Sequence, residues 1–130
     1  MTLRCVIVDD NPDVLRAASD LLEREGLVVV GVATTSEQAL LLMRDLGPDV
    51  MLVDIDLGTE SGFDLARRLG QTSGQTSGTG ASHTILISTH DEADYADLIA
   101  ASPAIGFLSK ADLSATAIRG VLEPSRGETS

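Results

Sequence analysis

Short, mostly apolar runs alternate with amphipathic stretches along the whole chain. The runs are four to seven residues long, which suits buried strands and is too short for helices. They cover residues 3–8, 27–33, 50–53, 84–88 and 104–108. Helical spacing of apolar positions follows each run, and it predicts helices at 12–25, 35–46, 62–69, 91–101 and 112–122.

Capping residues and glycines mark the ends of the first two helices. Asn11, directly before a proline, predicts the start of the first helix, and Thr34 with Glu37 has the spacing of a capping box for the second. Gly26 and Gly47 provide the stops.

Five repeats of strand and helix predict an α/β domain of the flavodoxin-like (βα)5 type, a five-stranded parallel sheet flanked by five helices. We expect this domain at residues 1–124, with a short polar tail at 125–130. Residues 71–82 read QTSGQTSGTGAS and predict a flexible inserted loop after a helix that ends at Gly70.

Charge and composition narrow the range of functions. The 130 residues contain nine Lys and Arg against twenty Asp and Glu, a formal charge of −11, with a pI near 4.3. This surface disfavours direct binding of nucleic acid or anionic membrane. No apolar stretch approaches the ~20 residues of a membrane span, and no signal peptide precedes the first acidic pair, so we expect a cytoplasmic protein. The lone Cys5 is expected to be buried.

Polar residues follow four of the predicted strands. Asp9 and Asp10 end the first, Asp54 the third and Ser88 the fourth, while Lys110 comes just after the fifth. The carboxyl ends of parallel strands meet at one edge of a sheet, so these groups should converge. Two carboxylates about 4 Å apart repel by roughly 4 kcal/mol at an effective dielectric of ~20, which favours a hard divalent cation such as Mg²⁺.

This set of groups can stabilise a transferring phosphoryl group, with Asp54 as the nucleophile. Each residue alone has a simpler explanation. Asp54 suits a turn, Ser88 a local backbone hydrogen bond, and Lys110 an exposed surface position. Only their convergence indicates a site.

The sequence resembles the bacterial response-regulator receiver domain over about residues 3–122. The resemblance rests on five segments in the family's order: Val6-Ile7-Val8-Asp9-Asp10, Met51-Leu52-Val53-Asp54, Gly62-Phe63, Ile85-Leu86-Ile87-Ser88 and Gly106-Phe107-Leu108-Ser109-Lys110. It implies the fold already predicted from the pattern.

The resemblance also implies the residues' roles. Asp54 matches the aspartate that receives a phosphoryl group from a sensor histidine kinase or a phosphotransfer protein. Asp9, Asp10 and Asp54, together with the backbone carbonyl of Asp56, match the Mg²⁺ ligands. Ser88 and Lys110 match the phosphoryl-binding hydroxyl and ammonium, and Phe107 matches the aromatic switch.

Four positions depart from the family pattern or vary within it. Gly58 stands where proline is frequent, which suggests a more mobile loop, and Ala111 replaces the proline after the lysine, where a cis peptide would cost about 3 kcal/mol. Asp56 and His90 are candidate modulators of dephosphorylation, although the simpler explanation, a loop acid for Asp56 and a bystander for His90, is favoured for each residue alone.

These features predict a phosphorylation-dependent signalling switch made of a receiver domain alone. Its output lies in a partner protein bound by the face of the fourth helix, fifth strand and fifth helix, which also suits a homodimer through Tyr95 and Leu98. The alternatives are a phosphorylation-independent binding module of the same fold, or a fragment of a longer regulator with a DNA-binding domain. A haloacid-dehalogenase-like phosphatase, suggested by the spacing of Asp54 and Asp56, is disfavoured because that motif normally ends the first strand.

Overall fold

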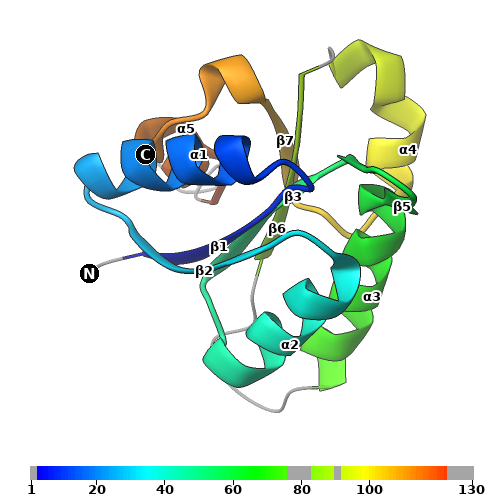
Figure 1. The fold of residues 1–130 in the computed structure, drawn as a ribbon. Coiled ribbons are helices and arrows are strands. Elements are labelled where there is room, and N and C mark those ends of the chain that lie inside the picture. Colours follow the sequence, from blue (N-terminus) through cyan, green and yellow to red (C-terminus); the bar gives the residue numbers. More distant parts are fainter. Residues whose placement is uncertain (1–2, 76–82, 90–91, 123–130) are drawn as a thin grey trace, which may run out of the picture.

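A computed structural model of the chain describes residues 3–75, 83–89 and 92–122, apart from the side chains of 71–75 and of residue 92. Within these residues a five-stranded parallel sheet has the order β2-β1-β3-β6-β7 (Figure 1). Its strands are β1 (Arg4–Val8), β2 (Val28–Ala33), β3 (Val50–Asp54), β6 (His83–Ser88) and β7 (Gly106–Ser109). The sheet predicted from the apolar pattern is therefore confirmed.

Five α-helices cover the two faces of this sheet (Figure 1). One face carries α1 (Pro12–Arg24) and α5 (Ala115–Leu122), and the other carries α2 (Ser36–Leu46), α3 (Gly62–Gln75) and α4 (Ala96–Ala101). Two 3₁₀ turns, η1 (Glu92–Tyr95) and η2 (Lys110–Asp112), precede α4 and α5. Among the described helices, none is long and apolar enough to cross a bilayer.

The core has two layers because successive strand residues point to opposite faces of the sheet. In β1, Cys5 and Ile7 pack with α1 and α5, whereas Val6 and Val8 pack with α2 and α3. All four side chains are fully buried. Burial on both faces explains why the strands are continuous apolar runs in the sequence.

The first two helices begin at polar caps, one of which differs from the prediction. Asn11 caps α1 by accepting a hydrogen bond from the Asp13 amide. The cap of α2 is Thr35 and not Thr34, because the Thr35 side chain accepts from the Gln38 amide. The Gln38 side chain in turn accepts from the Thr34 amide at 2.9 Å, so the reciprocal arrangement sits one residue later than predicted.

The predicted end of the third helix at Gly70 is wrong. Helix α3 continues to Gln75, so the first five residues of the expected loop at 71–82 are helical, and 76–82 lie outside the described residues. Gly70 serves close packing: a Cβ there would lie 3.0 Å from Cγ of Pro103, in the segment before β7. A helical glycine costs about 1 kcal/mol relative to alanine, which tertiary packing can offset.

The starts of the last two helices also differ from the prediction. Within the described residues, from 92 on, the expected helix at 91–101 is a 3₁₀ turn followed by the six residues of α4. The last helix starts at Ala115 and not at Asp112, because Leu113 has an extended backbone. A short antiparallel hairpin of β4 (Asp56–Leu57) and β5 (Glu60–Ser61) was not predicted, since two-residue strands leave no apolar period.

Candidate functional site

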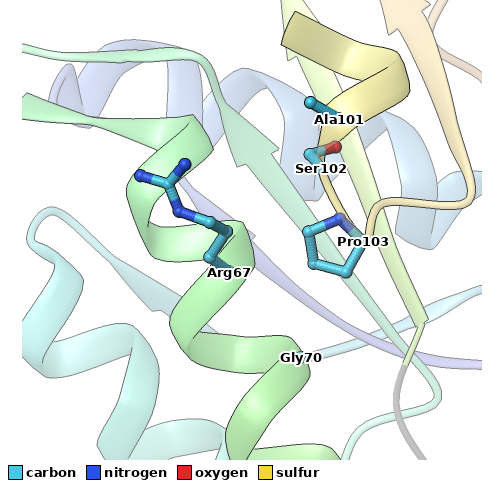
Figure 2. Close-up of a pocket in the computed structure, with 5 residues that line it drawn as sticks. All are labelled: Arg67, Gly70, Ala101, Ser102 and Pro103. Carbon is cyan, nitrogen blue, oxygen red and sulfur yellow. The ribbon is translucent and has the colours of Figure 1, made fainter.

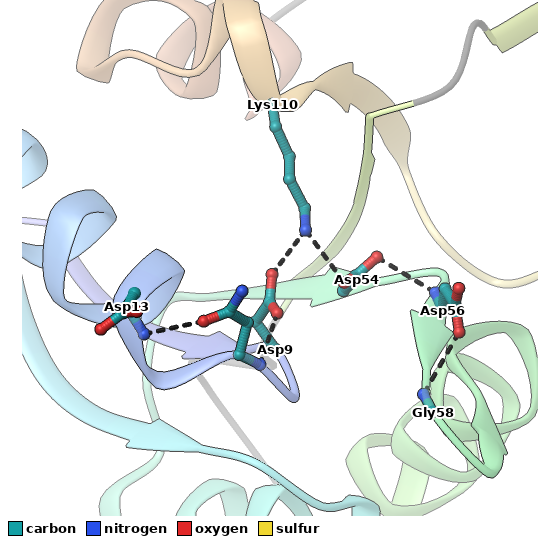
Figure 3. A network of polar contacts seen from close by, with 7 residues as sticks. Asp9, Asp13, Asp54, Asp56, Gly58 and Lys110 are labelled. Atoms are coloured by element: carbon teal, nitrogen blue, oxygen red, sulfur yellow. Dashed lines mark hydrogen bonds and ion pairs between the residues drawn. The ribbon is translucent and has the colours of Figure 1, made fainter.

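Three of the predicted polar groups, Asp9, Asp54 and Lys110, meet at the carboxyl edge of the sheet (Figure 3). Asp9 follows β1, Asp54 is the last residue of β3, and Lys110 follows β7 directly. Strands β1 and β3 are neighbours in parallel register, so Asp9 and Asp54 lie on adjacent strand ends. The sheet thus brings Lys110 against residues that lie 56 and 101 positions earlier in the chain.

Lys110 bridges the two buried carboxylates. Its Nζ donates to Oδ2 of Asp9 at 2.6 Å and to Oδ2 of Asp54 at 3.0 Å. The side chain of Asp9 is 1% exposed and that of Lys110 18% exposed, so these charges are poorly screened by water. One cation therefore compensates two acids that could not otherwise remain ionised together.

The second oxygen of each buried carboxylate accepts a backbone hydrogen bond. The Asn11 amide donates to Oδ1 of Asp9 at 2.9 Å, and the Asp56 amide donates to Oδ1 of Asp54 at 3.1 Å. Both amides lie two residues after the aspartate, the geometry of an Asx turn. These two amide donors were not predicted from the sequence, although an aspartate at the end of a strand before a loop is the usual signal for such a turn.

Burial and charge shift the protonation of this site in identifiable ways. Burial raises the pKa of Asp54, and the nearby Asp9 carboxylate adds to this effect, while the Asp56 amide and the Lys110 ammonium oppose it. Burial alone would lower the pKa of Lys110, but its hydrogen bonds to Asp9 and Asp54 outweigh burial and raise it above the ordinary value. Lys110 is therefore charged at neutral pH.

The acidic cluster fits a divalent cation. Oxygens of Asp9, Asp10 and Asp54 lie within 4.8 Å of one another, with Asp9 and Asp54 buried and Asp10 exposed. Carboxylate oxygens are the hard donors that Mg²⁺ prefers, and an exposed carboxylate leaves an open side for water or a phosphoryl oxygen. Lys110 neutralises one of the three negative charges, so an unbalanced negative charge remains for a metal ion.

The other predicted site residues lie around this cluster. Ser88 is buried at the end of β6, the strand next to β3, and Phe107 is half-buried in β7. The exposed Asp56 side chain turns toward its own loop, where Oδ1 accepts from the Gly58 amide at 3.2 Å. The peptide between Lys110 and Ala111 is trans. His90 lies outside the described residues.

Hollows on the described part of the domain include two that lie outside the acidic cluster. An apolar one of about 400 Å³ lies between α1 and the start of η2, beside Lys110 and Ala111. Another, of about 440 Å³, separates α3 from the end of α4 (Figure 2) and is lined by Arg67, Gly70, Ala101, Ser102 and Pro103. In the second hollow, Arg67 is ion-paired with Asp64 on its own helix and Ser102 donates to the Ile99 carbonyl. Of these two hollows, the first is lined by a residue of the site, Lys110.

Curated relatives of the chain include regulators of transcription and signalling. A putative transcriptional regulator of Pseudomonas aeruginosa is 29% identical over 107 residues, which is 82% of this chain and 49% of the relative. The heme response regulator HssR of Staphylococcus saprophyticus is 37% identical over 65 residues, 50% of this chain and 29% of the relative. The chain thus spans about half or less of the length of these relatives.

Solved structures agree with this relationship. The chain superposes on a LuxR-family two-component response regulator from Aurantimonas sp. SI85-9A1 with a TM-score of 0.80 and 26% identity, covering 98% of this chain and 87% of the other. The receiver domain of the putative response regulator NarL from Mycobacterium tuberculosis gives 0.77 and 28%, covering 97% and 98%. Residues 5–119 match the response regulator receiver domain, so the chain belongs to this family of signalling domains.

Proposed function

We propose that this domain is a phosphorylation-dependent switch in which Asp54 accepts a phosphoryl group from a histidine kinase or a phosphotransfer protein. The observation that carries the proposal is the pair of buried carboxylates, Asp9 and Asp54, bridged by Lys110 beside the exposed Asp10. This arrangement combines a nucleophile, a cation and a metal-binding cluster within a few ångströms.

The residues divide the work of the transfer. An oxygen of Asp54 attacks the phosphorus of a phosphohistidine; an O–P bond forms, the P–N bond breaks, and its electron pair stays on the imidazole nitrogen. Lys110 pairs with one phosphoryl oxygen and the Ser88 hydroxyl donates to another. Asp9, Asp10, Asp54 and the Asp56 carbonyl would hold Mg²⁺, which would supply positive charge to stabilise the transferring group.

The face of α4, β7 and α5 is the proposed output surface. Strand β7 carries Phe107 within the layer that includes Tyr95, whose ring lies 6.0 Å from that of Phe63. Leu98 on α4 is 53% exposed, which leaves an apolar contact for a partner protein or a second copy. Ser88 pairs in register with Ser109, next to Lys110, so movement of its hydroxyl is coupled to β7.

The apolar hollow beside Lys110 is the proposed docking point of the phosphate donor. Helix α1 and Ala111 form its wall, and Lys110, which is bonded to Asp9 and Asp54, also lines it. A donor helix bound there would bring a phosphohistidine toward Asp54. Which kinase binds, and which protein receives the signal, depends on surfaces of the partners.

Beryllofluoride with Mg²⁺ mimics the phosphoryl group and tests this proposal by amide NMR. In the parent we expect shifts at Asp54 that spread through Ser88 and Phe107 to α4, and in Asp54→Asn we expect none of this spread. A response in neither protein, with Mg²⁺ bound, would replace the switch by a binding module that phosphorylation does not regulate. Turnover of p-nitrophenyl phosphate would instead favour a phosphatase; we expect none.

A further inference from the structure

The loop after β3 reaches the acidic cluster through a glycine. Gly58 has a φ of +75°, a left-handed backbone conformation that residues other than glycine and asparagine rarely adopt. A Cβ built on Gly58 would lie 3.1 Å from Oδ2 of Asp10, which is closer than ordinary van der Waals contact. The glycine backbone thus occupies the space directly beside one of the three carboxylates.

Two hydrogen bonds, both drawn in Figure 3, hold the loop that places Gly58 beside Asp10. The Asp56 amide donates to Asp54, and the Gly58 amide donates to Oδ1 of Asp56 at 3.2 Å. The chain therefore makes two successive turns that start from the nucleophilic carboxylate and end against Asp10. Gly58 is held in place from the same strand end that carries Asp54.

Two other described glycines provide a comparison. Gly26 and Gly47 also have positive φ, of 98° and 55°, but a Cβ at either position would have nothing within 4 Å. They serve the ends of α1 and α2. Gly58 shares their backbone geometry and differs in facing a carboxylate of the acidic cluster.

We propose that Gly58 is a positioning residue for the divalent cation, because its missing side chain lets the Asp10 carboxylate lie at the metal. The proposal rests on the metal-dependent function proposed above. In the absence of a cation the exposed Asp10 side chain can rotate away from an added methyl group at little cost. In the metal-bound protein Asp10 must stay near Asp9 and Asp54, so the added methyl group acts against metal binding.

The test is a Mg²⁺ titration of the full chain, monitored by amide NMR. We expect Gly58→Ala to raise the Mg²⁺ dissociation constant roughly tenfold, the low end of the range for losing a neighbour that orients a ligand. Gly58→Asn also adds a Cβ but tolerates the left-handed backbone, and we expect a similar increase. Gly26→Ala is the matched control, because it also adds a Cβ at a positive φ, of 98°, and we expect it to leave the dissociation constant unchanged.

A double-mutant cycle identifies the route of the effect. In an Asp10→Ala background, adding Gly58→Ala should change the dissociation constant no further, since the carboxylate it acts through is gone. A further loss there, normal binding by Gly58→Asn, or weaker binding by Gly26→Ala would each overturn the proposal. A parent that binds no Mg²⁺ would overturn it too. A parent that binds Mg²⁺ without responding to beryllofluoride would overturn only the switch, and the cycle would still decide the role of Gly58.

Discussion

At the scale of single residues, Lys110 is bound to two buried carboxylates at once. We expect Lys110→Met to lower the free energy of unfolding by about 3 kcal/mol without Mg²⁺, because Asp9 and Asp54 are left facing each other without a cation. Mg²⁺ should restore part of this loss and bind the variant more tightly than the parent, since the ammonium no longer competes. Urea unfolding with and without MgCl₂ measures both effects.

The control for this prediction is Arg16→Met, which removes an exposed cation from α1. It changes the net charge equally but should shift stability by only a few tenths of a kcal/mol, as exposed charges usually do. If Lys110→Met lost the same stability at every Mg²⁺ concentration, the metal and the ammonium would not share the two carboxylates.

Cys5 provides a second prediction at this scale. Its thiol is fully buried in β1, and burial, with smaller contributions from Glu23 and Asp49, raises its pKa from 9.0 to about 11. Only the thiolate reacts, so disulfide reagents should label the native protein at pH 8 far more slowly than the urea-unfolded chain. Rapid labelling of the native state would contradict the burial of β1.

The same thiol affects stability at high pH. The unfolded thiol ionises near pH 9, whereas the folded one keeps its proton to about pH 11. Between these values the native state binds more protons, so stability falls as pH rises, by up to about 1.4 kcal/mol per pH unit from this group. Cys5→Ala should lack this contribution, which unfolding curves between pH 8 and 11 can measure.

At the scale of elements, two neighbouring threonines at the start of α2 have different roles. The Thr35 side chain accepts from the Gln38 amide, so Thr35→Ala should cost about 1 kcal/mol of stability. The Thr34 hydroxyl donates to the exposed Gln38 side chain, at 3.2 Å, and Thr34→Ala should cost a few tenths of a kcal/mol. Parallel urea unfolding of the two variants checks the order, and the reverse order would place the cap at Thr34.

The strands were predictable from sequence, but several helix ends were not. Burial on both faces of a parallel sheet produces apolar runs that are visible in the sequence itself. Helix ends depend on contacts with distant residues, as when Pro103 packs against Gly70 within the continuing helix α3. The extended backbone of Leu113, which delays α5, likewise leaves no local signal.

The site likewise has features that the sequence predicts and features that it does not predict. Asp9, Asp54 and Lys110 were predictable because strand ends in a parallel sheet must converge. The turn that points the Asp56 side chain to Gly58, and brings Gly58 against Asp10, depends on the backbone path after β3. Residue type alone shows that a glycine is present there, and only the structure shows what a side chain would contact.

At the scale of the whole molecule, an excess of acidic charge surrounds an acidic site. The formal charge of −11 favours cations in general, because self-repulsion destabilises the compact state. Mg²⁺ bound to the cluster of Asp9, Asp10 and Asp54 should add to the free energy of unfolding, because a ligand that binds only the native state stabilises it by mass action. Salt and Mg²⁺ should therefore both stabilise the protein, but Mg²⁺ at much lower ionic strength.

The pH dependence of stability distinguishes Mg²⁺ binding at the acidic cluster from general screening of the negative net charge. Burial raises the pKa of Asp54 above its ordinary 3.8, so between 3.8 and the folded value the native state binds more protons than the unfolded chain. Without Mg²⁺, this group's contribution to stability therefore falls as pH rises through that window. Mg²⁺ binds the carboxylate, so its stabilising effect should grow over the same window. Subtracting the stability of Asp54→Asn from that of the parent, in urea unfolding from pH 4 to 8, isolates this group from the other acids. A difference that is independent of pH, with or without Mg²⁺, would mean that Asp54 is ionised throughout and that its burial leaves its protonation unchanged.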